Sequence, residues 1–190
     1  DNISIKINGK DIRVSKHFYL LLNKPKGYVS TTVSDKDKTV IDLVPDKYKT
    51  RTLFPAGRLD KDTTGLMLIT DDGVFAHNIL SPKKHIKKIY EVVIDKEISV
   101  EMVNGFRDGV KLNDGECKSA LLEKIDTNKC LVTLTEGRYH QIKRMFGNYK
   151  AKVIELKRIC MGELYLPSDL AVGKVREVRD EELLKIQSKK

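Results

Sequence analysis

The segment FPAGRLDKDTTGLMLITDDG, residues 54–73, concentrates acidic residues and glycines around a short apolar run. Five of its residues match positions 1, 3, 5, 6 and 12 of a calcium-binding loop: Asp60, Asp62, Thr64, Gly65 and Asp71. The match is incomplete, because position 12 normally carries a bidentate Glu, and a Pro and a Gly precede the segment where a helix should enter. A plain acidic turn explains Asp62, Asp71 and Asp72 equally well. Asp72 lies outside the calcium pattern, so the two interpretations compete only for Asp62 and Asp71.

Asp60 differs from the other acids in its surroundings. Arg58 lies two residues before it, and Gly57 and Gly65 flank it on a loop that enters an apolar strand. Such a loop holds a carboxylate rigidly while a substrate approaches. A two-carboxylate hydrolase needs a second acid at a distance that the sequence does not give. No serine-nucleophile motif or phosphate-binding glycine loop is present, so the pattern leaves one candidate reactive carboxylate.

Composition narrows the class of partner. The chain has 190 residues, with 36 Lys and Arg against 27 Asp and Glu, and a formal net charge of +9. This excess favours an anionic partner, either nucleic acid or a membrane surface. There is no apolar run of membrane-spanning length and no secretory signal, so we predict a soluble, cytoplasmic protein. The odd, widely spaced cysteines Cys117, Cys130 and Cys160 indicate reduced, partly buried thiols rather than disulfides or zinc ligands.

Periodicity predicts the elements that position Asp60. Residues 3–14 alternate and turn at Asn8-Gly9, which predicts a hairpin. We expect residues 1–16 to be the remnant of a small module and residues 17–190 to be the main domain, for which subdomains of about 17–110 and 111–190 are one option. A strand is predicted from residue 18 that ends at Pro25 and Gly27, and further strands in 66–70, 88–95, 119–125, 129–137, 151–156 and 162–166, with a turn at 72–73.

Three helices are predicted. The first begins after Ser99, buries Val100, Val103 and Phe106, and ends by Gly109. The second, residues 140–149, presents Ile142, Met145, Phe146 and Tyr149 on one face, with Arg144 on the solvent side. The last runs from a cap at Asp180 to Ile186. Because strands outnumber helices and follow one another directly, we predict an α+β fold with a mixed, largely antiparallel sheet and flanking helices.

Four segments, in this order, carry a family resemblance: LLNKPKGY (21–28), GRLDKDTTGLMLITDDG (57–73), KKIYEV (87–92) and EGRYHQIKRMF (136–146). The second resembles the signature of the RNA pseudouridine synthases, and all four resemble motifs of the branch that acts on ribosomal RNA. The likeness covers about residues 18–186. Lys143 resembles the small-subunit (16S) rRNA enzyme, because large-subunit relatives usually carry Arg there. The resemblance implies the pseudouridine synthase catalytic fold, and identifies residues 1–16 with the last hairpin of an S4-like RNA-binding module.

The resemblance also implies a reaction and its catalytic residues. Asp60 corresponds to the family's nucleophile, which adds to the uracil ring or acts at the ribose before the freed base turns and rejoins through carbon 5. Tyr90 corresponds to the tyrosine that packs on the flipped uracil, and Lys143 to the cation that pairs with the aspartate. No cofactor and no metal are implied, because uracil is itself the leaving group and the returning nucleophile.

Substrate-binding residues follow from the same resemblance. Arg58 would occupy the space that the base leaves and hold a phosphate, although a salt bridge that fixes the loop is the alternative. Leu156 would line the base pocket, while Arg138 and Gln141 would shape the site, with Arg138 in reach of RNA. RNA phosphates would contact Lys83, Lys84, Lys87 and Lys88, although a solvated charge run explains any one of them.

We therefore expect an isomerase whose partner is ribosomal RNA, in particular small-subunit rRNA or an assembling small subunit. We expect a monomer with no membrane partner. Two alternatives stay open: an enzyme that modifies large-subunit (23S) rRNA, and a non-catalytic rRNA-binding or ribosome-assembly factor. The second disagrees with the intact set of Asp60, Tyr90 and Lys143.

Overall fold

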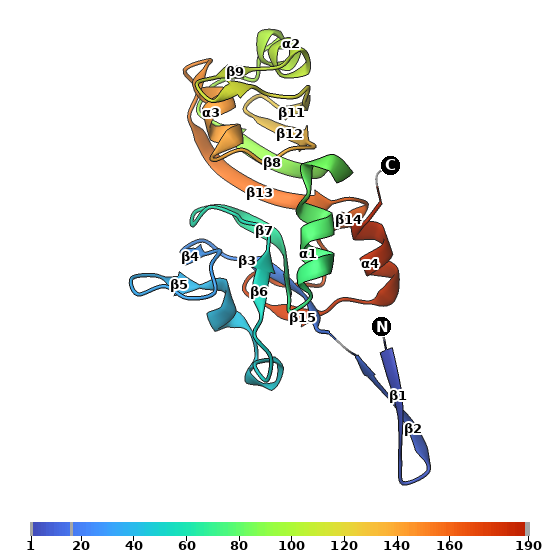
Figure 1. The fold of residues 1–190 in the computed structure, drawn as a ribbon. Helices are drawn as coiled ribbons and strands as arrows, with labels where there is room; N and C mark the ends of the chain where they lie inside the picture. The colour runs from blue at the N-terminus through green and yellow to red at the C-terminus, as the bar shows by residue number, and fades with distance from the viewer. Residues whose placement is uncertain (1, 16, 189–190) are drawn as a thin grey trace.

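The computed structural model describes residues 2–15 and 17–188. Its first element is the predicted hairpin, formed by β1 (Asn2–Ile7) and β2 (Lys10–Ser15). Asn8 and Gly9 both have positive φ, 52° and 77°, as a tight two-residue hairpin turn requires. The hairpin stands apart from the rest of the ribbon (Figure 1). Its descent from an S4-like module stays a prediction.

One large sheet organises the main domain. Its strands are β3 (Tyr19–Lys24), β6 (Phe54–Ala56), β7 (Thr64–Thr70), β8 (Lys88–Ile94), β11 (Leu121–Asp126), β12 (Lys129–Leu134), β13 (Val153–Met161), β14 (Leu164–Tyr165) and β15 (Val175–Glu177). The order is β11–β12–β8–β13–β7–β3–β15, with β14 beside β13 and β6 beside β7. Within the described chain, β13–β7 is the single parallel pair of this sheet. The predicted mixed, largely antiparallel sheet is confirmed.

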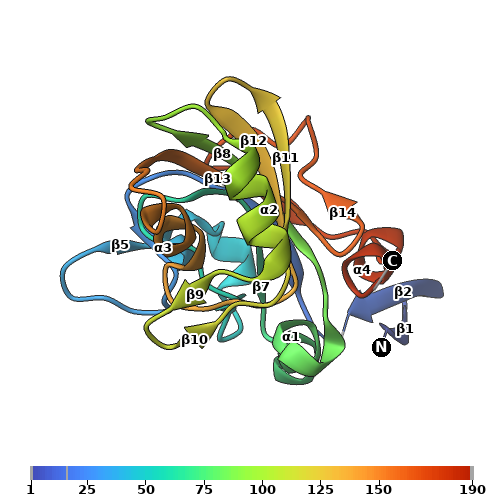
Figure 2. The same cartoon turned by 90° about the horizontal axis from the view of Figure 1, so that it is seen from above.

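The sheet carries its cores in two halves, seen as the upper and lower parts of Figure 1. In the upper half, α2 (Val100–Asp108) and α3 (Gln141–Gly147) pack against β8, β11, β12 and β13, and the rings of Phe106 and Phe146 lie 4.8 Å apart. Figure 2 shows α2 and α3 together above the sheet. In the lower half, α1 (Gly73–Leu80) and α4 (Asp180–Ile186) pack beside β7 and β14. A division at residue 110 does not follow these cores, because Phe106 and Phe146 share one.

The two halves meet along a short seam. β13 and β7 pair only through Lys157 with Thr64 and Arg158 with Gly65. The described chain also contains smaller elements: β4 (Tyr28–Val29), β5 (Lys38–Thr39), β9 (Lys111–Leu112), β10 (Gly115–Glu116), and 3-10 turns at Val40–Leu43, Asp46–Tyr48 and Pro82–Lys84. In the part of the chain described here, no helix has the length and apolar character to cross a bilayer.

Three helical predictions need correction. The prediction for α2 is right about Ser99, whose side chain accepts a hydrogen bond from the Met102 amide, but wrong about Val100, which is 75% exposed. Met102 takes the buried place instead. The acidic turn at 72–73 is the start of α1, because the Asp72 carboxylate caps it. Asp180 lies inside the first turn of α4, whose cap position is Arg179.

Two other expectations about side chains can be compared with the structure. Cys117, Cys130 and Cys160 are buried free thiols, as predicted. Arg144 is half-buried rather than free in solvent, and its guanidinium forms hydrogen bonds with the Asp114 carboxylate at 2.9–3.1 Å. This ion pair ties α3 to the turn between β9 and β10.

Candidate active site

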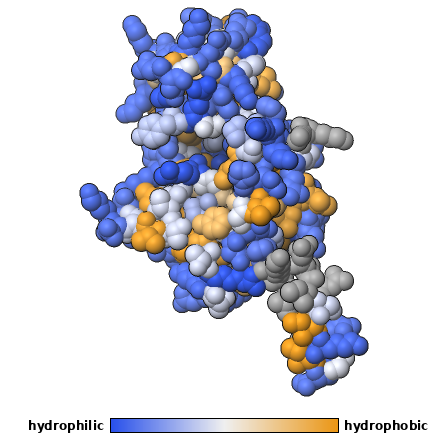
Figure 3. Space-filling model, in the orientation of Figure 1, coloured by the Kyte–Doolittle hydropathy of each residue, from blue (hydrophilic) through white to orange (hydrophobic). Residues whose placement is uncertain are grey.

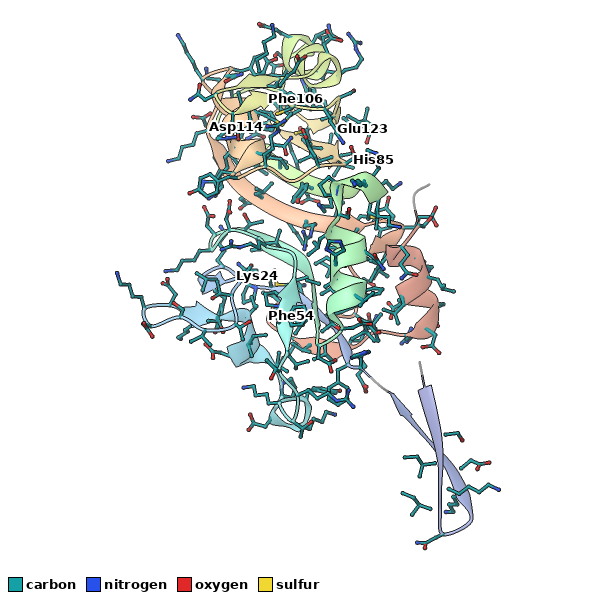
Figure 4. All side chains as sticks on the ribbon, viewed as in Figure 1. Lys24, Phe54, His85, Phe106, Asp114 and Glu123 are labelled. Atoms are coloured by element: carbon teal, nitrogen blue, oxygen red, sulfur yellow. The ribbon has the colours of Figure 1, made fainter. Side chains whose placement is uncertain are left out.

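The loop of residues 57–63, between β6 and β7, carries Asp60 and is anchored from below by Lys24 at the end of β3. The Lys24 ammonium donates to the backbone carbonyls of Asp60 at 3.0 Å, Lys61 at 3.1 Å and Thr63 at 2.7 Å. The side chain is fully buried in the lower half (Figure 4), and burial lowers its pKa to about 8. One buried cation thus holds three backbone carbonyls of the loop.

The residues after Lys24 complete this support. The Ser30 hydroxyl donates to the Leu59 carbonyl at 2.7 Å and accepts from the Leu59 amide at 3.0 Å. The Gly27 amide donates to the Lys61 carbonyl at 2.8 Å. Polar backbone groups of the loop therefore bind the segment 24–30 on the side away from solvent, and the Asp60 side chain is left to face the opposite way.

Gly65 follows the loop at the start of β7. Its φ of +107° is unfavourable for other residues, and a Cβ there would lie 2.2 Å from the Arg158 carbonyl oxygen. Only glycine allows β7 to approach β13 this closely. The seam between the halves and the position of the Asp60 loop both depend on this residue.

The Asp60 carboxylate contacts two basic side chains from the upper half, Lys143 and His140. Lys143 Nζ lies 3.2 Å from Asp60 Oδ2, and His140 Nε2 lies 3.2 Å from Asp60 Oδ1. Lys143 projects from the first turn of α3. His140 precedes α3 with a φ of +46°, a left-handed conformation that is uncommon for residues other than glycine. The expected contact between Lys143 and Asp60 is therefore present, and His140 is a second partner.

Lys143 also contacts Asp62, at 2.8 Å. This hydrogen bond holds the pKa of the Asp62 carboxyl below its ordinary value. Partial burial works against the charge of Lys143, but its hydrogen bonds with Asp62 and Asp60 outweigh that effect and raise its pKa. Lys143 consequently keeps its charge through the physiological pH range.

A cleft of about 610 Å³ opens beside Asp60, between the two halves of the domain. Figure 3 shows the surface hollowed there. A smaller recess of about 80 Å³ adjoins it and has an apolar wall that includes Tyr90 and Leu156. Asp60 and Tyr90 line both spaces. The structure therefore brings together Asp60, Tyr90, Lys143 and Leu156 as the sequence predicted.

The site also contains Arg58, Arg138 and Gln141, which differ in exposure and in hydrogen bonding. Arg58 is exposed at the rim, and no carboxylate of the described chain pairs with it, so the loop-fixing salt bridge is not formed. Arg138 donates to the carbonyls of Asp114 at 3.2 Å and Glu116 at 2.9 Å. The buried Gln141 side chain accepts from the Arg138 amide at 2.9 Å. Arg138 and Gln141 therefore stabilise the conformation of the 137–140 loop.

The lysine run is only partly at the cleft. Lys88 lines it, whereas Lys83 and Lys84 are exposed outside it and Lys87 is half-buried outside it. RNA contact by these three stays a prediction.

The acids of the calcium-loop pattern do not converge. The Asp71 carboxylate accepts from the Phe18 amide at 2.7 Å. Asp60 lies before the start of β7, and Asp71 follows its end. The first and last positions of the pattern are thus separated by a whole strand, and Asp60 and Asp62 share Lys143.

The sequence did not identify Lys24, Ser30 and His140 as site residues. Lys24 and His140 fall inside motifs that carry the family resemblance, so their place in the chain was visible but their contacts were not. Ser30 follows such a motif directly. Their roles depend on contacts with the Asp60 loop that only the fold shows: Lys24 and Ser30 bind the backbone of that loop, and His140 contacts the Asp60 carboxylate.

Comparison with known proteins identifies the class. Residues 18–148 match the family model described as RNA pseudouridylate synthase. The chain is similar to an uncharacterized RNA pseudouridine synthase of Bacillus subtilis, with 39% identity over 96% of this chain and 79% of the relative. It is also similar to ribosomal small subunit pseudouridine synthase A of Escherichia coli K12, with 41% identity over 88% of this chain and 73% of the relative.

A solved structure supports the same conclusion. A crystal structure of a pseudouridylate synthase superposes with a TM-score of 0.85 at 34% identity, covering 96% of this chain and 83% of that one. The fold and the matched sequence define an isomerase that acts on RNA. The chain belongs to the RNA pseudouridine synthase family.

Proposed function

We propose that this protein converts a uridine of small-subunit ribosomal RNA to pseudouridine, with Asp60 as the nucleophile. The observation that carries the proposal is the Asp60 carboxylate, held at the cleft between Lys143 and His140 at 3.2 Å from each and beside the Tyr90-lined recess. The choice of small-subunit rRNA is supported by the name of the Escherichia coli relative and its 41% identity.

The reaction is an isomerisation, so its bonds balance within the substrate. The bond between N1 of uracil and C1′ of the ribose breaks, and a bond between C5 and C1′ forms. C5 gives up its proton and N1 gains one. Asp60 adds to the uracil ring or to C1′ and is released when the new bond is complete, so the carboxylate is regenerated.

The surrounding side chains have separate tasks in this proposal. Lys143 holds a positive charge 3.2 Å from the Asp60 carboxylate and orients it toward the cleft. The uracil enters the recess between Tyr90 and Leu156, where packing on an aromatic face offsets part of the cost of unstacking it from RNA. Arg58, unpaired and at the rim, fills the place that the base leaves.

The decisive test is pseudouridine mapping across both ribosomal RNAs in three strains: wild type, a deletion, and a strain that carries Asp60→Asn. We expect one small-subunit site to be lost in the deletion and in the Asp60→Asn strain. If the deletion instead lacks a pseudouridine in large-subunit rRNA, the proposed small-subunit substrate is wrong and large-subunit rRNA is the substrate. An unchanged map in the deletion would contradict the enzymatic function and favour an rRNA-binding or assembly factor.

A matched pair of purified variants tests the nucleophile. Asp60→Asn is nearly isosteric, so we expect folding and RNA binding to persist while single-turnover isomerisation falls at least about 10³-fold. Asp62→Asn changes the neighbouring carboxylate on the same lysine and should cost less than about tenfold. Measurable turnover by Asp60→Asn, or an equal loss in both variants, would show that Asp60 is not the nucleophile.

A further inference from the structure

The inner wall of the cleft carries two cations that the proposed chemistry does not use. Lys88 and Tyr90 are two positions apart on β8, and Arg158 of β13 is the cross-strand partner of Tyr90. Alternate residues of a strand, and residues directly opposite on a neighbouring strand, project from the same face of a sheet. All three line the cleft. The sheet therefore places Lys88 and Arg158 on the same side as Tyr90.

Arg158 is almost fully buried, with 2% of its surface exposed. Its Nε donates to the Leu66 carbonyl at 2.8 Å, but its Nη2 has no hydrogen-bond partner in the described chain. Among the same residues, no carboxylate forms an ion pair with it. A buried guanidinium without a counter-charge lowers stability, so its retention at a cleft wall indicates a ligand that supplies the missing acceptor.

Lys88 is half-buried at the same wall of the cleft. Its ammonium lies close to the 137–140 loop, 3.7 Å from the position that a Cβ on Gly137 would take, and it makes no ion pair within the described residues. Burial and the nearby charge of Arg158 lower its pKa to about 8. Two positive charges therefore lie at the same wall of the cleft, and neither has an ion-pair partner among the described residues.

The acids and cations nearest to the pair are already committed elsewhere. Asp60 contacts His140 and Lys143, and the Arg138 guanidinium bonds to backbone carbonyls. Within residues 2–15 and 17–188, no carboxylate pairs with Lys88 or Arg158, so an anion bound in the cleft is the natural counter-charge for them.

We propose that Lys88 and Arg158 form a subsite for a phosphate of the RNA backbone next to the uridine that enters the active site. This assignment rests on the proposed isomerisation of an RNA uridine at Asp60. The phosphate accepts a hydrogen bond from Lys88 Nζ in front of the buried Arg158 guanidinium, and its single negative charge offsets one of the two positive charges. The contact fixes the sugar of the target nucleotide relative to Asp60 while the base occupies the recess beside Tyr90.

The test compares the binding of uridine, uridine 5′-monophosphate and uridine 3′-monophosphate to the intact protein, measured by NMR titration. We expect at least one monophosphate to bind about tenfold more tightly than uridine, as a charge-assisted contact would give. Lys88→Met should reduce that preference to less than about twofold. Lys84→Met is the matched control, an exposed lysine from the same segment outside the cleft, and should keep the full preference.

Lys88→Met is chosen because it removes an uncompensated charge, so its free energy of unfolding at neutral pH should equal or exceed that of the wild type. Equal affinity of wild type for uridine and both monophosphates would overturn the subsite, as would an unchanged preference in Lys88→Met. These outcomes are independent of rRNA mapping. A negative map with an intact, Lys88-dependent phosphate preference would reject the rRNA substrate and keep the phosphate subsite.

Discussion

Replacement of Lys24 by Met tests how the active-site loop is held. Met has a similar unbranched shape but no donor, so Lys24→Met leaves the carbonyls of Asp60, Lys61 and Thr63 without the partner that lies 2.7–3.1 Å away. An unsatisfied buried acceptor costs about 1–3 kcal/mol. Because loop carbonyls regain part of their bonding from water, we expect a total loss of about 3–5 kcal/mol in the free energy of unfolding.

The assay is urea unfolding followed by circular dichroism, with thermal unfolding as a second measure. For a chain of this size the expected loss corresponds to a fall in Tm of about 10 °C. Lys61→Met is the matched control from the same loop. The Lys61 ammonium binds the Asp37 carboxylate at 2.6 Å at the surface, where an ion pair contributes about 0–1 kcal/mol.

Catalysis gives an independent measurement of the same contact. The Asp60 loop that loses its anchor moves away from Lys143 and His140, and a misplacement of about 1 Å costs about 10²-fold in rate. We expect this loss in single-turnover isomerisation at saturating RNA for Lys24→Met and not for Lys61→Met. If Lys24→Met unfolds within about 1 kcal/mol of the wild type and keeps its rate, the loop is held by other contacts and the reasoning is wrong.

Three further predictions follow from other contacts. Lys143→Ala should lower turnover at saturating RNA by about 10²-fold while Lys143→Arg stays within about tenfold, and wild-type turnover of Lys143→Ala would reduce the residue to a binding role. Gly65→Ala should destabilise by about 3 kcal/mol or more because its Cβ meets the Arg158 carbonyl, and a urea-measured loss below about 1 kcal/mol would contradict the close approach. The buried Glu182 carboxylate has its pKa lowered by the hydrogen bond from Arg176, so its contribution is present above the ordinary value of 4.5 and is lost as the pH falls below it. The gap in unfolding free energy between wild type and Glu182→Gln, about 2–4 kcal/mol at pH 7, should narrow progressively as the pH falls below 4.5, and a gap that does not change with pH would argue against the ion pair.

Local patterns predicted the parts of this fold in which one face of an element is clearly apolar. The alternation in β8 and the turn at Asn8-Gly9 are of this kind. The helix α1 was missed because Asp72-Gly73 is typical of a turn, and only the packing of Phe75 and Ile79 in the lower core makes the segment helical. Tertiary burial overrode the local signal there.

Some features of the candidate site could also be predicted from the sequence, and others could not. The pairing of Asp60 with Lys143 followed from the family resemblance, which ordered the motifs along the chain. The burial of Lys24 and Arg158 did not, because long cationic side chains are almost always exposed and nothing in one sequence marks the exceptions. Both depend on strand pairing with Gly65 at the start of β7, from β3 for Lys24 and from β13 for Arg158, which brings distant segments together. The left-handed backbone of His140 likewise depends on the loop around it.

The narrow seam between β13 and β7 determines when the protein becomes active during its synthesis. Asp62 and Lys143, which meet across the cleft, are separated by 81 residues in sequence. Contacts of such long range form only after the entropy of closing the intervening chain has been overcome, and a domain made on the ribosome exposes its amino-terminal segments first. The segment with Asp60 therefore emerges well before its partner cation, and β13, which supplies the seam, emerges after both. A nascent chain has no assembled catalytic site until nearly the whole domain has been translated, so catalysis reports the completed fold rather than any part of it.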